Sequence, residues 1–162
     1  MHSPNRHPLG RLRLSAAAGV FLAIAVAAPS ARAELGGNYD SVLRDQAALH
    51  ATLTTQESPA YTTYILDMPD RTQVREYFSQ HSGVFAIDWS GDGRRPNMRQ
   101  VLGAYYSRFG RPEGAPRTGR NNPVRRADPD FVLDSRVAMR HFTGRAYIPQ
   151  AVPQEVAIVD VR

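Results

Sequence analysis

The sequence predicts an α+β domain in which a small antiparallel β-sheet is packed by one amphipathic helix, with an additional N-terminal helix. Three short runs rich in aromatic and β-branched residues follow one another between residues 61 and 90 with turn-like connections, which is typical of an antiparallel meander. Apolar residues recur at helical spacing between residues 97 and 109, and further extended runs follow residue 131. A small sheet needs a cover for its apolar face, so we expect the 97–109 helix to lie across it.

The individual elements follow from local patterns. Residues 40–53 predict the N-terminal helix, with Asp40 as its cap. Arg75 and Glu76 adjoin in a predicted strand and should therefore point to opposite faces of the sheet. Gly144 indicates a bulge or a tight turn between two strands. The predicted strands are 61–67, 72–78 and 84–90 in the meander, and 131–133, 137–142, 145–148 and 156–161 after it.

The first 33 residues have the layout of a secretory signal peptide. A segment with arginines and no acids precedes an apolar run from residue 14 to residue 28, and a small-x-small pattern ends at Ala33. An apolar run of about 15 residues is short against the roughly 20 needed to span a bilayer. We therefore expect cleavage between Ala33 and Glu34, no transmembrane segment in the mature chain, and export to the periplasm or beyond the cell.

Residues 34–162 then form a single domain whose composition excludes several chemistries. The chain of 162 residues has no Cys, and all 20 of its basic residues are Arg. Disulfides, thiolate zinc sites, thiol nucleophiles, Schiff-base lysines and lysine-dependent phosphate loops are therefore absent. The formal net charge of the mature chain is +1, but the charge is unevenly distributed: residues 34–93 carry a net −6 and residues 94–126 a net +8.

A basic loop rich in Pro, Gly and Arg is expected at about residues 110–126, because this stretch has almost nothing to bury. It could contact an anionic surface. The candidate contacts are Arg111, Arg117, Arg120, Arg125 and Arg126. We expect no nucleic-acid partner, since the nearby aromatic residues already lie on the buried stripe of the 97–109 helix.

No metal, cofactor or nucleophile site can be read from the sequence. His50, His81 and His141 lack the close spacing of metal ligands, and the calcium-like stretch 88–93 has Arg99 where a bidentate Glu belongs. The remaining catalytic alternative is an envelope hydrolase that uses a carboxylate pair such as Glu76 and Asp88. From the sequence we therefore expect a protein without enzymatic activity and without a cofactor.

Five segments together resemble a proteobacterial exported family catalogued as domain of unknown function 2844. They are Leu35–Gly37, Thr72–Tyr77, Gly83–Trp89, Leu102–Tyr106 and Met139–Pro149, and they span nearly the whole mature chain. Two features depart from the family pattern: Arg71 stands where the family tends to have a turn glycine, and residues 91–95 replace a shorter connection. The resemblance implies export and a small domain, and it brings no activity and no catalytic residues.

These observations favour an exported, non-catalytic binding or accessory protein of the bacterial cell envelope. Its expected partner is an unidentified envelope protein or an anionic surface component. The alternatives are the hydrolase described above and an anionic-surface binder that acts through the Arg-rich loop.

Overall fold

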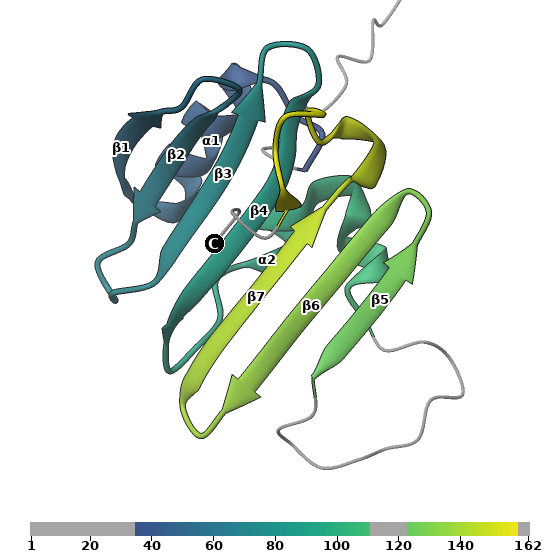
Figure 1. Cartoon of the computed structure of the whole chain (residues 1–162). Helices are drawn as coiled ribbons and strands as arrows, with labels where there is room; N and C mark the ends of the chain where they lie inside the picture. The colour runs from purple at the N-terminus through teal and green to yellow at the C-terminus, as the bar shows by residue number, and fades with distance from the viewer. Residues whose placement is uncertain (1–34, 111–122, 159–162) are drawn as a thin grey trace, which may run out of the picture.

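The computed structural model describes residues 35–110 and 123–158, which form one seven-stranded antiparallel sheet with two helices (Figure 1). The strand order is β1-β2-β3-β4-β7-β6-β5, so the two edge strands are β1 and β5. The bounds are β1 Thr52–Glu57, β2 Thr62–Asp67, β3 Gln73–Ser79, β4 Gly83–Asp92, β5 Val124–Asp128, β6 Phe131–Ala138 and β7 His141–Tyr147. The predicted α+β class, with a small antiparallel sheet and an N-terminal helix, is confirmed.

The meander β2-β3-β4 is confirmed close to its predicted bounds, whereas the N-terminal helix is shorter than expected. Helix α1 (Tyr39–Leu49) is capped by the side chain of Asn38, not by Asp40. It ends because His50 adopts a left-handed conformation with φ of 52°. The threonine-rich segment that follows becomes β1, since β-branched residues favour a strand over a helix.

The predicted 97–109 helix is divided into two parts. Helix α2 (Met98–Leu102) ends at Gly103, whose φ of 50° and ψ of −121° are incompatible with a continuing α-helix, and a 3-10 segment runs from Gly103 to Arg108. The predicted apolar stripe still faces the sheet. Met98, Val101 and Leu102 are buried, and the aromatic residues that follow are half-buried against the core.

The C-terminal half corrects several expectations. The end of the predicted loop, residues 124–126, belongs to β5 (Val124–Asp128), and residues 111–122 lie outside the described residues. The predicted strand 137–142 is instead a hairpin between β6 and β7, with Met139 at a φ of 57° in the turn. Gly144 lies within β7, where the pairing is continuous, and marks no bulge or turn. Residues 156–158 form no strand, and the rest of that prediction, 159–162, lies outside the described residues.

Position 144 requires a glycine because Trp89 of the neighbouring strand packs against it. A Cβ atom on Gly144 would clash with the indole ring, which is almost fully buried. Trp89 and Gly144 are directly paired between β4 and β7. The glycine therefore makes room for the largest side chain of the core.

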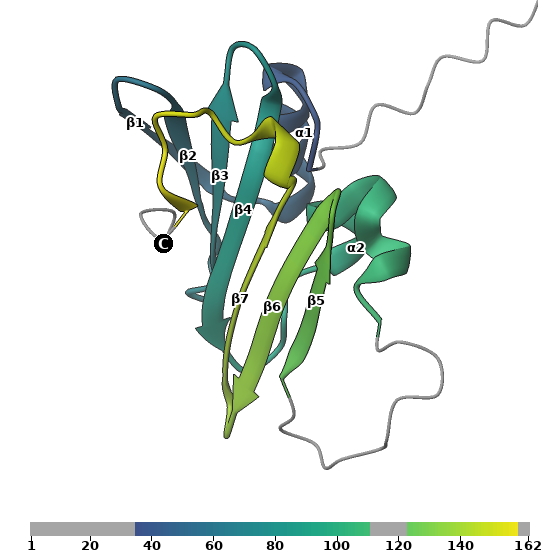
Figure 2. The ribbon, with the colours of Figure 1, turned by 45° about the vertical axis from the view of Figure 1, so that its right-hand side comes forward.

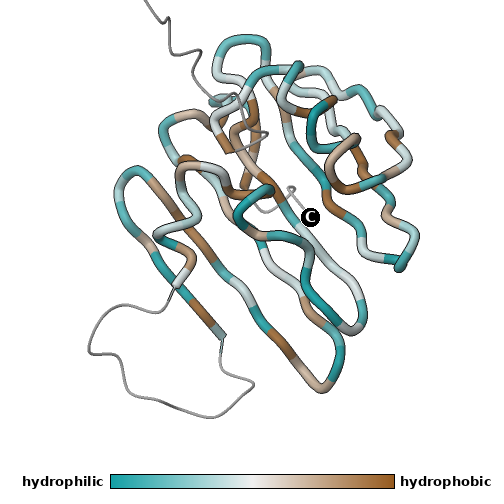
Figure 3. Tube along the Cα trace, turned by 180° about the vertical axis from the view of Figure 1, so that it is seen from behind, coloured by the Kyte–Doolittle hydropathy of each residue, from teal (hydrophilic) through white to brown (hydrophobic). Residues whose placement is uncertain are grey.

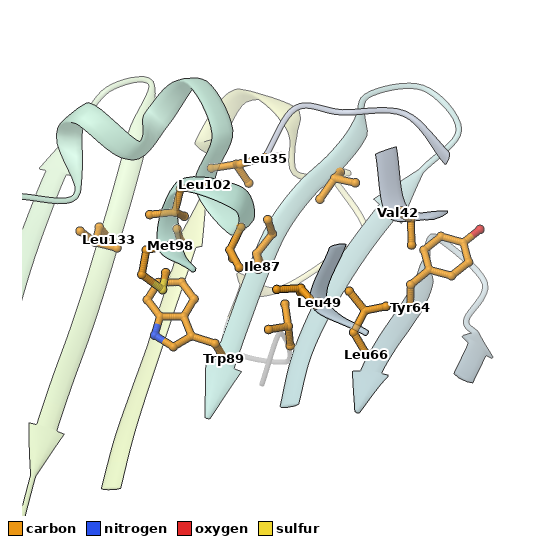
Figure 4. Close-up of a cluster of buried hydrophobic side chains, with 14 of the residues drawn as sticks. Leu35, Val42, Leu49, Tyr64, Leu66, Ile87, Trp89, Met98, Leu102 and Leu133 are labelled. Carbon is orange, nitrogen blue, oxygen red and sulfur yellow. The ribbon is translucent and has the colours of Figure 1, made fainter. Parts of the chain in front are cut away.

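The two faces of the sheet are covered differently. Helices α1 and α2 cover one face and bury the main hydrophobic core, with Val42, Leu49, Met98 and Leu102 directed toward the strands (Figures 2 and 4). On the other face, the segment after β7 folds back and packs with Tyr61, Tyr77 and Phe85. Along the strands, hydrophobic and hydrophilic residues alternate, as the tube in Figure 3 shows from the helix side. Within the described part of the chain, no helix has the length and apolar character needed to cross a membrane.

Candidate functional site

A row of alternating charges crosses the face of the sheet that carries no helix. Strand pairing places its members next to one another on five neighbouring strands. In spatial order they are Arg75 on β3, Asp88 on β4, Arg145 on β7, Asp134 on β6 and Arg125 on β5. We call these five residues the charge ladder. Opposite charges directly across from each other stabilise an antiparallel pair, which explains why the strands tolerate so many ionised groups.

The inner end of the ladder is partly buried. Arg75 Nη1 lies 3.6 Å from Asp88 Oδ1, and Tyr77 Oη donates a 2.7 Å hydrogen bond to Asp88 Oδ2. Arg145 Nη1 donates to the carbonyl oxygen of Ile158 at 3.0 Å, which ties the C-terminal segment to the ladder. Burial raises the pKa of the Asp88 carboxyl, while the hydrogen bond from Tyr77 and the charges of Arg75 and Arg145 act in the opposite direction.

Tyr77 is held as a neutral hydrogen-bond donor. Burial raises the pKa of its phenol strongly, and the negative charge of Asp88 raises it further. The inner end therefore forms a fixed network that orients Asp88 and closes it off from solvent.

The outer end of the ladder is open to solvent. Arg125 Nε lies 3.4 Å from Asp134 Oδ2, with side-chain exposures of 66% and 42%. On the same face, Arg136 is exposed one step further along β6, and His141 Nδ1 lies 2.9 Å from Asp92 Oδ1. In Figure 1 the C-terminal segment passes over the upper part of β4, and no other described element covers the lower parts of β5, β6 and β7. We call this uncovered area the open face.

A second cluster of ionisable groups lies on the opposite side, beneath the helices. Asp45 of α1 and Glu76 of β3 are 0% and 1% exposed. Gln100 of α2 donates a 2.7 Å hydrogen bond from Nε2 to Asp45 Oδ1. Burial raises the pKa of Glu76 well above its ordinary value, and the neighbouring carboxyl group of Asp45 raises it further. The folded state therefore favours the neutral form of Glu76.

The carboxylate pair suggested by the sequence is not brought together. Glu76 is paired with Ile87 and faces the helices, whereas Asp88 is paired with Arg75 and faces the charge ladder. The prediction that Arg75 and Glu76 point to opposite faces is confirmed by the same register. Glu76 and Asp88 therefore cannot act on one substrate from the same side of the sheet.

The histidines also lie apart from one another. His50 follows α1, His81 lies in the turn between β3 and β4, and His141 begins β7. The stretch considered for calcium continues as β4 up to Asp92 instead of forming a loop. No cluster of three or more potential metal-ligating side chains occurs among residues 35–110 and 123–158.

The arginines proposed to contact an anionic surface divide into two groups. Arg125 and Arg126 lie in β5, not in a loop, and each is close to a carboxylate: Arg126 Nη1 is 3.6 Å from Asp128 Oδ2. The other three, Arg111, Arg117 and Arg120, lie outside the described residues.

Sequence reasoning missed Asp45, Gln100 and the charge ladder. Asp45 had a detectable signal, because it stands three residues after Val42 and four before Leu49 on the buried stripe of its helix. The ladder had none, since its members become neighbours only through the pairing of β4 with β7 and of β6 with β5.

Comparison with known proteins gives one match. The model of a family described as "Protein of unknown function (DUF2844)" matches residues 31–161. No curated protein matches the chain. No solved structure matches it either.

Proposed function

The chain belongs to the DUF2844 family of proteins of unknown function, and we propose that it is an exported, non-catalytic binding protein of the bacterial cell envelope that recognises its partner through the open face. Export is supported by the signal-peptide pattern that ends at Ala33. The partner is an envelope protein or an anionic surface component with a complementary pattern of charge.

The observation that carries the proposal is the different placement of the two sets of ionisable groups. The carboxyl groups of Asp45 and Glu76 are fully buried beneath the helices, out of reach of a substrate in solution. The ionisable groups that solvent does reach, such as Arg125, Asp134 and Arg136, are spread over a sheet face. A face of this kind suits recognition of a macromolecule, whereas catalysis requires groups that converge on one reacting atom.

The energetics of the ladder also support a binding role. Exposed ion pairs contribute about 0 to 1 kcal/mol to stability. The pair between Arg125 and Asp134 is of this kind, with both side chains largely exposed. Its charges are therefore not needed to hold the sheet together, and they remain available to a partner that offers the opposite pattern.

Affinity capture from envelope extract tests this proposal. The bait is the chain from Glu34 to Arg162, at low and at moderate salt, beside an Arg125→Gln/Arg136→Gln variant of the open face. Arg71→Gln/Arg94→Gln, which removes the same charge from exposed positions in turns, is the control. We expect one stoichiometric partner that survives moderate salt and is lost with the open-face variant only.

Retention of nothing at either salt would contradict a binding function. Equal retention by the wild type and by the open-face variant would show that the open face is not the recognition surface.

A further inference from the structure

A second basic surface lies on the helix side of the sheet. From Gly93 to Gly110 the chain contains four arginines and no acidic residue. Arg108 is already neutralised, because its guanidinium donates to Asp128 at 2.6 Å and to Asp130 at 2.8 Å. This leaves Arg94, Arg95 and Arg99, and none of the described carboxylates lies within 4.0 Å of them.

Two of these arginines lie over the rings of one aromatic stack. The rings of Tyr106 and Phe109 are nearly parallel, with centroids 6.3 Å apart. Arg99 Cζ lies 4.7 Å from the centroid of Tyr106, and Arg95 Cζ lies 5.6 Å from that of Phe109. Phe109 in turn meets the edge of Trp89 with centroids 6.2 Å apart, so the stack is anchored in the core. We call these four stacked residues (Arg95, Arg99, Tyr106, Phe109) the basic ledge.

Cation–π contact restricts a guanidinium without using its N–H donors. A guanidinium that lies over a ring presents its donors around its edge, where a planar or tetrahedral anion can accept two of them at once. Each of the two rings has one arginine over it, so Tyr106 and Phe109 help to position the two cations. The ledge is therefore preorganised for a compact anion.

The charge balance at the ledge favours such an anion. Arg99 and Arg94 are exposed, and Arg95 is half-buried. Burial lowers the pKa of Arg95 from its ordinary value. A phosphate group carries up to two negative charges and three acceptor oxygens, which is enough to satisfy two guanidinium groups together.

We propose that Arg95 and Arg99, held over Phe109 and Tyr106, form a binding site for a phosphoryl group. This site goes beyond the open face, because its residues lie in α2, in the following 3-10 segment and just before and after them, behind the sheet (Figure 2). The phosphoryl group belongs either to a small phosphate ester or to the headgroup of a phospholipid.

Titration of the full chain distinguishes these two sources. Inorganic phosphate and glucose 1-phosphate are titrated against a chloride reference at constant ionic strength, with calorimetry and with the emission of Trp89, the single tryptophan, as readouts. Co-sedimentation with vesicles of phosphatidylglycerol and phosphatidylcholine, against vesicles of phosphatidylcholine alone, is the lipid arm. The wild type and all variants contain the same residues 1–34, so any contribution of that segment to binding is the same in each of them.

Arg95→Gln/Arg99→Gln is the test variant, and Arg71→Gln, at an exposed turn position outside both the basic ledge and the open face, is the control. The test variant loses a charged hydrogen bond at each arginine, so its dissociation constant should rise at least about tenfold. Tyr106→Leu keeps both charges but removes the ring beneath Arg99, and it should weaken binding to a smaller extent. If Arg95→Gln disturbs folding, as circular dichroism would show, Arg99→Gln alone carries the test because Arg99 is exposed.

Binding of the soluble phosphates with loss in the test variant would support a small ester as the ligand, and vesicle binding alone would support a phospholipid headgroup. Absence of both, or equal binding by the wild type and the test variant, would overturn the proposal.

Discussion

At the residue scale, the buried pair of Asp45 and Glu76 gives the domain an unusual dependence on pH. The folded state raises the pKa of Glu76, so above the ordinary pKa of a glutamate the unfolded chain binds fewer protons than the folded one. The free energy of unfolding therefore falls as the pH rises toward the raised pKa, and full stability is retained only below the ordinary value. This direction is opposite to that of an ion-paired carboxylate.

Glu76→Gln should flatten this dependence. If the folded state keeps one proton that the unfolded state has lost, the free energy of unfolding changes by about 1.4 kcal/mol per pH unit. A glutamine side chain has no such proton. Urea unfolding at several values between about pH 5 and about pH 7 measures the slope. Glu57→Gln, at an exposed position on β1, is the control and should leave the slope unchanged. An equal slope in Glu76→Gln and the wild type would contradict a raised pKa of Glu76 in the folded state.

A substitution at Gly144 tests how closely Trp89 packs in the core, because it adds a single Cβ atom. Gly144→Ala places a methyl group against the indole ring of Trp89 and should destabilise the domain by about 1 to 3 kcal/mol. Gly110→Ala is the control, because a Cβ atom there meets nothing within 4 Å. Urea unfolding and near-ultraviolet circular dichroism of Trp89 follow the effect. Equal stability of both variants would mean that Trp89 does not lie over Gly144.

Substitutions at Arg71 test the backbone conformation of the turn between β2 and β3. Its φ of 66° lies in the left-handed region that favours glycine, so Arg71→Gly should stabilise the fold by up to about 1 kcal/mol. Arg71→Ala keeps the Cβ atom and should not stabilise it. If thermal unfolding shows the same gain for both variants, the arginine side chain and not the backbone is responsible.

At the element scale, the first helix depends on its cap. The side chain of Asn38 accepts a 3.1 Å hydrogen bond from the backbone N–H of Ser41, and Leu49 and Val42 bury the helix against the core. Asn38→Ala should destabilise the domain by about 1 kcal/mol, and Asn38→Asp should not, since aspartate caps equally well. Urea unfolding compares the two. Similar losses in both would show that the cap hydrogen bond is not the cause.

The helices and strands also show which sequence signals are sufficient to predict an element. Period-two alternation and turn residues predict β2, β3 and β4 because these strands pair with their sequence neighbours. The 97–109 helix was only partly predicted, because apolar spacing does not reveal that Gly103 leaves the helical conformation. β5 was missed because its five residues, in a stretch rich in arginine, carry no strand pattern and are held in place by β6.

At the scale of the whole molecule, the open face could not be predicted from the sequence for a related reason. The fold class follows from local periodicity, which the sequence contains. The charge ladder depends on the pairing of β4 with β7, in which Asp88 and Arg145 are 57 positions apart along the chain. The buried Asp45–Glu76 pair likewise depends on where α1 lies across β3. Long-range pairing, and not residue type, therefore decides which ionisable groups meet.

The first 33 residues carry a prediction of their own. Mass spectrometry of the protein recovered from the periplasm or the medium should find a chain that begins at Glu34, because the small residue at Ala33 fits the signal peptidase site. A block variant, Ala31→Arg/Ala33→Arg, should accumulate as the uncleaved form. Recovery of the wild type with an intact N-terminus from the cytoplasm would contradict export.

The most direct test of the open face as a recognition surface is a charge swap at the outer end of the ladder. Arg125→Asp/Asp134→Arg keeps opposite charges next to each other across β5 and β6 but inverts the pattern shown to a partner. The account predicts an unfolding midpoint close to that of the wild type together with loss of the partner captured from envelope extract. Unchanged capture of that partner by the swapped protein would contradict it.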